Sequence, residues 1–224
     1  MGRFTLLRKV VLLASVAALF GGSLFISGSA HADGPPPVDA THYKITCDTL
    51  LKGSAKFKPP LHLGGTTTPA ITQVKGTLSG CTATPDGSNP AVTVVSGGVS
   101  GVINGANNDC LALLGPSTAS GTLTIKWKTS GDQKMTSSTT VVTITSGDIS
   151  GGTNTPFGDS ATYGQFNINN TTQTGPFGGP SGTGAASFTH ALTAEGLTSL
   201  GAQCGDPVKG LKQVTLGSAE TSLG

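Results

Sequence analysis

The segment Gly121-Thr-Leu-Thr-Ile-Lys-Trp-Lys-Thr129 decides the fold class of this chain. Leu123, Ile125 and Trp127 are apolar, and the residues between them are Thr or Lys. A period of two is the pattern of a β-strand with one buried side and one side in water. We therefore predict a central antiparallel strand that buries Trp127, the only tryptophan of the chain, and points the neighbouring lysines to solvent.

The same alternation recurs in other short segments, which are separated by Gly, Pro, Asn and Asp residues typical of turns. We predict strands at 42–47, 52–58, 71–80, 91–103 (two pieces with a bulge or bend at Gly97-Gly98), 121–129, 139–145, 163–168, 185–190 and 211–216. A helical turn is predicted at 110–114 and a helix at 192–204. The pattern predicts an all-β fold, an antiparallel β-sandwich or jelly-roll-like domain of about nine strands with one or two short helices.

The first residues have the features of a secretory signal. A basic start is followed by the apolar run Val10–Ile26 and by Ala30-His31-Ala32, a small-x-small cleavage motif. We expect a signal peptide at 1–32 with cleavage after Ala32, a flexible Pro-rich leader at 33–41 and a single disulfide-stapled β domain at 42–224. A membrane anchor is the alternative, because the run approaches the length of a bilayer span. No later stretch is apolar enough to span a membrane, so we expect a secreted, extracellular or wall-associated protein.

Charge argues against one class of partner. Removal of the signal takes away both arginines and one lysine, and leaves ten lysines against eleven carboxylates. Nucleic-acid binding relies on clustered cations and favours Arg for contacts to phosphates and bases. We therefore expect no nucleic-acid partner.

Four cysteines follow the signal: Cys47, Cys81, Cys110 and Cys204. An even number in an exported chain indicates disulfides, and four cysteines allow three pairings. We favour Cys47–Cys81, from two neighbouring strand segments, and Cys110–Cys204, from two segments predicted as short helices or loops. A zinc site is the alternative, but the spacing contains no C-x-x-C motif.

Several of these segments resemble a group of small secreted actinobacterial proteins without assigned activity. The resemblance is carried by residues 76–82, 108–111, 121–129, 163–166, 204–205 and 210–212, which include three of the cysteines, strand segments and glycine turns. It implies export and a β-rich fold. It implies no functional residues.

Motifs for chemistry are sparse. Gly158-Asp159-Ser160 is similar to the start of one esterase family, but the only later histidine, His190, lacks the D-x-x-H context of that family. His42 and His62 are not spaced as metal ligands. Asn107-Asn108-Asp109 offers oxygens to calcium without the D-x-D-x-D pattern, so we interpret it as a turn. We predict no cofactor and no metal.

Half of the aromatic residues after the signal fall within one short stretch: Phe157, Tyr163, Phe166 and Phe177. They can pack the core and fix long loops, or they can form an exposed binding platform for a glycan or a protein. These four aromatic residues are therefore our candidate binding surface.

These observations favour an exported, non-catalytic β protein that acts by binding or as a component of the cell envelope or its surroundings. An envelope glycan or a protein is the expected partner. The alternative is an exported hydrolase whose site cannot be recognised from the sequence.

Overall fold

The computed structural model describes residues 35–87, 90–110, 117–131, 133–151, 166–168, 171–178, 186–192 and 194–224. These residues belong to the compact unit Gly34–Gly224. Its strands are β1 (Lys44–Leu61), β2 (Ala70–Thr84), β3 (Val94–Gly105), β4 (Ser117–Thr129), β5 (Thr139–Gly151), β6 (Phe166–Ile168), β7 (Thr171–Thr174), β8 (Ser187–Leu192) and β9 (Leu211–Leu223), and its helix is α1 (Ala194–Cys204).

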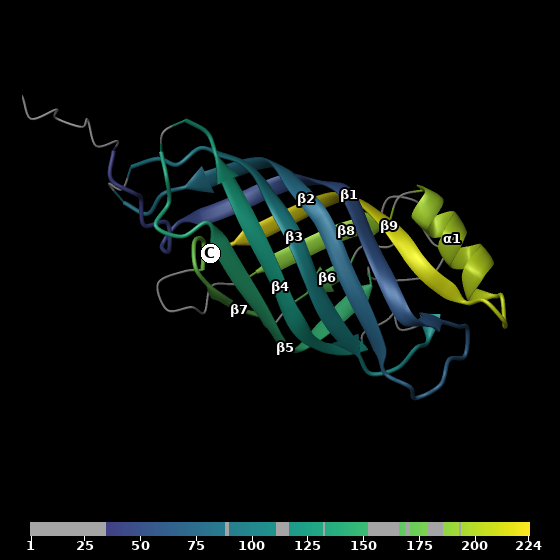
Figure 1. Ribbon diagram of the computed structural model, residues 1–224. Coiled ribbons are helices and arrows are strands. Elements are labelled where there is room, and N and C mark those ends of the chain that lie inside the picture. Colours follow the sequence, from purple (N-terminus) through teal and green to yellow (C-terminus); the bar gives the residue numbers. More distant parts are fainter. Residues whose placement is uncertain are drawn as a thin grey trace, which may run out of the picture. The chain divides into compact units, whose positions relative to one another are not determined.

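All nine strands belong to one antiparallel sheet (Figure 1). Its order is β4-β3-β2-β1-β9-β8-β6-β5-β7, and a further pairing joins β4 to β5. The sheet is therefore curled, and its concave side encloses the apolar core. The predicted all-β class, the antiparallel pairing and the number of strands are confirmed. The strands form one continuous curled sheet, whereas in a sandwich they would be divided between two sheets.

The central strand lies as its alternation predicts. In β4, Leu123, Ile125 and Trp127 are buried, whereas Lys126 and Lys128 are exposed. The β5 strand pairs with β4 in an antiparallel hairpin, and it buries Val142 and Ile144 on the same side. Burial of such side chains stabilises the fold by roughly 1.5–3 kcal/mol each.

Several strands differ from the prediction in their extent, and three differences stand out: β1, β9 and β7. The segments 42–47 and 52–58 form one strand, β1, which continues through a register shift near Lys52, a residue with φ 52°. The β9 strand runs to Leu223, because it pairs with β1 between Leu211 and Leu223 and with β8 between Leu216 and Ser222. The β7 strand was not predicted, since its sequence Thr-Thr-Gln-Thr has no apolar alternation.

The β3–β4 register shifts between Val94 and Ser96, ahead of Gly97-Gly98, so the bulge or bend predicted at these glycines is not found there. The β3 strand is continuous here, and Gly97 lies directly opposite Trp127 of β4. A Cβ atom at Gly97 would lie 2.5 Å from the indole ring. The glycine therefore makes room for the indole on the neighbouring strand.

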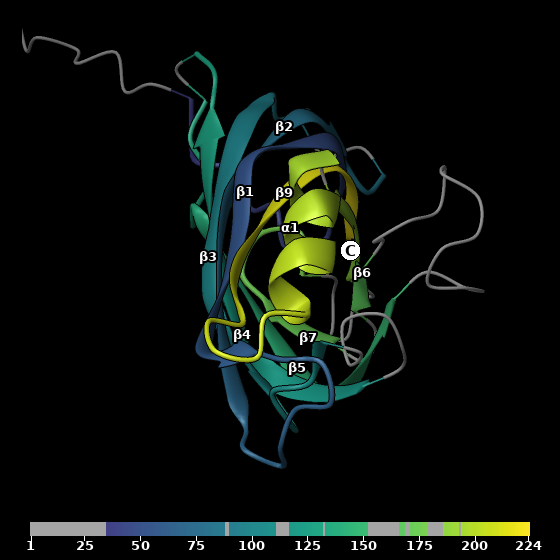
Figure 2. The same ribbon diagram turned by 90° about the vertical axis from the view of Figure 1, so that its right-hand side faces the viewer.

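The predicted helix is present as α1 and packs near β9 and β8 at one end of the curled sheet (Figure 2). Its last residue, Cys204, forms a disulfide with Cys110. The turn predicted at 110–114 lies outside the described residues, apart from Cys110 itself.

The Pro-rich leader is not flexible throughout. Val38 and Ala40 are buried, and Val38 forms a short parallel bridge with Met135. The backbone N–H of Phe177 donates a hydrogen bond to the carbonyl of Ala40 at 2.8 Å. These contacts fix the chain from Val38 onward, because its apolar side chains extend the core.

Candidate functional site: the lysine face of the sheet

The convex side of β1–β4 carries an unbalanced charge. These four strands contain seven lysines and one carboxylate, Asp48. The lysines are Lys44, Lys52, Lys56, Lys58, Lys75, Lys126 and Lys128, and all of them are exposed. We call the convex surface of β1–β4 that they occupy the lysine face.

The pairing of β1 with β2 concentrates three of these charges. Lys56 lies opposite Gln73, and Lys75 lies opposite Ser54, so that Lys56 and Lys75 are diagonal neighbours. Diagonal neighbours in an antiparallel pair are about 7–8 Å apart. Lys58 is two residues from Lys56 on the same side of β1. Since this spacing is within the Debye length of about 8 Å at physiological salt, the three positive fields add.

The β3 strand separates this cluster from the lysines of β4 and presents small side chains. Its Gly98 lies between Thr77 of β2 and Lys126 of β4, and Ser100 lies between Lys75 and Thr124. Lysines therefore stand on both sides of a strip with little side-chain bulk. Lysine is a strongly hydrated, flexible point charge, which suits contacts to exposed anionic groups.

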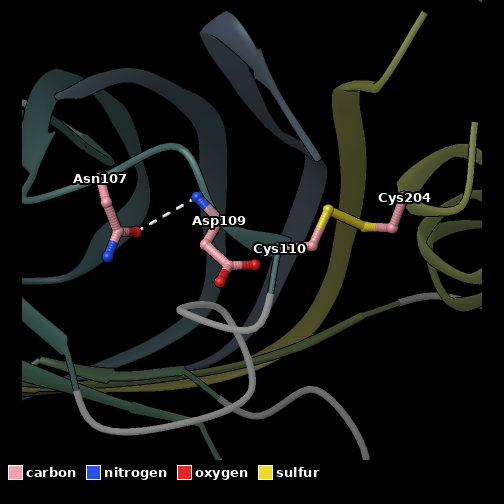
Figure 3. Close-up of a disulfide and its surroundings, with 4 residues drawn as sticks. All are labelled: Asn107, Asp109, Cys110 and Cys204. Atoms are coloured by element: carbon pink, nitrogen blue, oxygen red, sulfur yellow. Dashed lines mark hydrogen bonds between the residues drawn. A yellow bond between two sulfur atoms is a disulfide. The ribbon is translucent and has the colours of Figure 1, made fainter. Parts of the chain in front are cut away.

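A second group of polar residues precedes Cys110 of the Cys110–Cys204 disulfide and lies on one side of it (Figure 3). Asn107 Oδ1 accepts a hydrogen bond from the Asp109 N–H at 3.2 Å. The Oδ1 atom of the neighbouring Asn108, which is buried, accepts one from the Thr66 hydroxyl. These amide oxygens shape the turn that leads to Cys110, as predicted. In the described part of the chain, no three His, Cys, Asp or Glu side chains are placed to hold a metal ion.

The turn after α1 is fixed by its own carboxylate. The backbone N–H groups of Lys209 and Val208 both donate to Asp206 Oδ1 at 2.9 Å. These bonds, with that from Lys209 the strongest influence, hold the pKa of Asp206 below its ordinary value. The carboxylate is therefore a structural acceptor.

Phe177 does not belong to a binding surface, which corrects the prediction. It is fully buried, and its ring meets that of Trp127 edge to face with centroids 5.1 Å apart. Phe166 lies in β6, paired with Gly151 and His190. Phe157 and Tyr163 lie outside the described residues. The proposed platform therefore loses one of its four members to the core.

The histidines that we considered as catalytic residues lie at separate places in the described part of the structure. His190 lies in β8, opposite Ala219 of β9, whereas Ser160 is outside the described residues. His42 is exposed on the loop before β1, and His62 is half-buried next to Gly210. The Ser160–His190 pair therefore lies partly outside the described residues.

The two predicted disulfides are present. Cys47 is bonded to Cys81 across β1 and β2, where the two residues are opposite each other. Cys110 is bonded to Cys204. In the chain-entropy description, closing loops of 34 and 94 residues stabilises the fold by roughly 3–5 kcal/mol each.

The lysine face was missed in the sequence analysis, although part of its signal is visible there. Lys56/Lys58 and Lys126/Lys128 each have a spacing of two, which places both members of a pair on one side of a strand. The missing information was the order of the strands.

Comparisons with known proteins supply no relative. No family model, no curated protein and no solved structure matches this chain. Within the described residues, no helix has the length and apolarity needed to cross a membrane.

Proposed function

We propose that this chain is an exported, non-catalytic binding protein whose lysine face holds an anionic polymer of the cell envelope. The observation that carries the proposal is the charge of β1–β4, seven lysines against one carboxylate on four adjacent strands. The sequence features of an export signal and the two disulfides support the location.

The charge distribution requires explanation, because the chain after the signal is nearly neutral. Ten lysines and eleven carboxylates are present there, yet one carboxylate lies on β1–β4. Like charges on neighbouring strands are unfavourable. An anionic ligand would relieve that repulsion, and each exposed contact would contribute roughly 0.2–1 kcal/mol. Several contacts along one polymer add to a useful affinity.

Binding tests use the mature protein, residues 33–224, with three probes: hyaluronate, inorganic polyphosphate and neutral dextran. We expect both anionic polymers to bind, dextran not to bind, and the affinity to fall as salt rises from low to physiological strength. Sequencing of the secreted protein tests export separately, with Asp33 as the expected first residue.

The matched variants are K56Q/K75Q and K134Q/K209Q. Both remove two positive charges from exposed positions, but Lys134 and Lys209 lie in loops and not on the strands β1–β4. Loss of anionic-polymer binding in the first variant alone supports the lysine face. Equal effects of the two variants would show that only net charge matters, and unchanged binding in both would refute the proposal.

A further inference from the structure

Two rows of outward-facing residues cross seven neighbouring strands without a break in register. The first row contains one residue from each of β9, β1, β2, β3, β4, β5 and β7: Gln213, Lys56, Gln73, Val102, Thr122, Thr143 and Thr172. Each is directly paired with the next. We call this row ladder one.

Ladder two is the next outward row on the same strands. It runs through Thr215, Ser54, Lys75, Ser100, Thr124, Val141 and Thr174. The side chains of both ladders are exposed or partly exposed. Adjacent strands are about 4.7–4.9 Å apart, so the six steps of a ladder follow a path of about 28 Å along the outer surface of the curled sheet.

The ladders have two chemically different halves. Their lysines, Lys56 and Lys75, lie on β1 and β2. The part on β4, β5 and β7 consists of threonines and one valine. Neither ladder contains a carboxylate or an aromatic side chain.

This division indicates what kind of polymer fits. A hydroxyl group both donates and accepts hydrogen bonds, as sugar hydroxyls do. A polyphosphate offers acceptors only and carries charge along its whole length, whereas the threonine half offers it cations only beside the ladders, where Lys126 follows Thr124 on the outward side of β4. A polysaccharide with anionic groups at intervals satisfies both halves.

We propose that the ligand of the lysine face is an acidic polysaccharide that lies across the strands along both ladders. Its anionic groups meet Lys56 and Lys75, and its sugar hydroxyls meet Thr122, Thr143 and Thr172. This inference rests on the proposed function and adds to it the ligand class and the direction of the bound chain. The sheet face binds one extended chain, because the two ladders are only two residues apart on each strand.

The test compares hyaluronate chains that exceed the ladder length with short hyaluronate oligosaccharides that cover only two or three strands. The wild-type protein should bind the long chains more tightly per chain than the short ones. The variant T122V/T143V/T172V removes three hydroxyls and keeps the β-branched shape that suits a strand. Its affinity for long hyaluronate should fall roughly tenfold or more, since three hydrogen bonds are lost.

The control variant T67V/T93V/T136V removes three exposed threonine hydroxyls that lie outside the strands. It should bind long hyaluronate within about twofold of wild type, and both triple variants should bind short oligosaccharides and polyphosphate within about twofold. Thermal melting establishes that each variant is folded.

The outcomes separate the two proposals. If the ladder variant binds long hyaluronate as wild type does while K56Q/K75Q does not, the lysine face stands and the ladder is refuted. If neither variant loses binding, the proposed function fails as well. A wild-type affinity that does not depend on chain length overturns the ladder without any variant.

Discussion

The two sides of the same seven strands carry side chains of different kinds, which are under different physical constraints. Between the two outward ladders runs an inward row, formed by Val214, Ala55, Val74, Gly101, Leu123, Val142 and Gln173. All of its members except Gly101 are buried. The backbone and the pairing are shared, and only the direction of the side chain changes. The inner side is determined by volume, and the outer side by charge and hydroxyl groups.

Trp127 shows how tightly the inner side is fitted. Its ring faces Gly97 across the strand pair and meets Phe177 edge to face. Its Nε1–H donates to the Thr140 hydroxyl at 2.8 Å, and that hydroxyl donates in turn to the carbonyl of Pro176. By contrast, Lys126, its neighbour in sequence, is exposed. Substitutions at paired inner and outer positions therefore measure the difference directly.

The largest effect is expected from Trp127→Ala. Truncation of a buried tryptophan typically costs 3–5 kcal/mol, and here it also removes the ring contact with Phe177. We expect a loss of unfolding free energy of about 3–5 kcal/mol, or failure to fold. Denaturant unfolding followed by far-UV circular dichroism measures it. A loss below about 1 kcal/mol would mean that the indole is not part of the core.

A smaller loss is expected from Gly97→Ala, with Gly98→Ala as its matched control. A methyl group at Gly97 would lie 2.5 Å from the indole of Trp127, whereas one at Gly98 would have its nearest neighbour at 3.8 Å. Overpacking costs typically 1–3 kcal/mol. We therefore expect Gly97→Ala to lower the unfolding free energy by about 1–3 kcal/mol, and Gly98→Ala to be neutral or slightly stabilising.

A double-mutant cycle tests the cause. In a Trp127→Leu background the alanine at position 97 has room, so its cost should fall by at least half. Equal costs in both backgrounds would show that Gly97 is required for a reason other than the ring.

These glycines also show where reading the sequence succeeds and where it fails. The alternation in β4 predicts its buried side because that information is local. Gly97-Gly98 favours a bulge or bend in the sequence, because glycine weakens strands. Its actual reason, the indole of Trp127, lies on another strand.

The same limit applies to the candidate site. Lys56 and Lys75 become neighbours only through the register of β1 and β2. The β7 strand escaped prediction because its buried residue is the polar Gln173. Phe177 was placed in a possible surface because loop composition does not reveal which aromatic residue turns inward. The Cys47–Cys81 disulfide could be predicted, because it joins strands that are consecutive in the chain.

Thr140→Val should have the third-largest effect on the unfolding free energy. Its comparison is with Thr143→Val, because Thr140 has a buried hydroxyl and Thr143 an exposed one on the same strand. The change leaves Trp127 Nε1–H and the Pro176 carbonyl without this partner. We expect a loss of about 1–2 kcal/mol of unfolding free energy. Thr143→Val, on the outward side of β5, should change it by less than about 0.5 kcal/mol. Equal losses in urea unfolding would contradict the division between the two faces.

Lys126→Ala should have the smallest effect on stability. The side chain is exposed, and its paired neighbours on β3 and β5 are Gly98 and Thr139, neither of which can balance its charge. Lys128 lies two residues away on the same side of β4. Removal of Lys126 therefore relieves repulsion and loses little packing, and the change should stay within about 0.5 kcal/mol. Any gain should be larger at low salt than at high salt, because the repulsion is screened. Urea unfolding at two ionic strengths measures both quantities. A loss above about 1 kcal/mol that does not depend on salt would mean that the Lys126 stem is packed, and that the outer side, like the inner one, is built for stability.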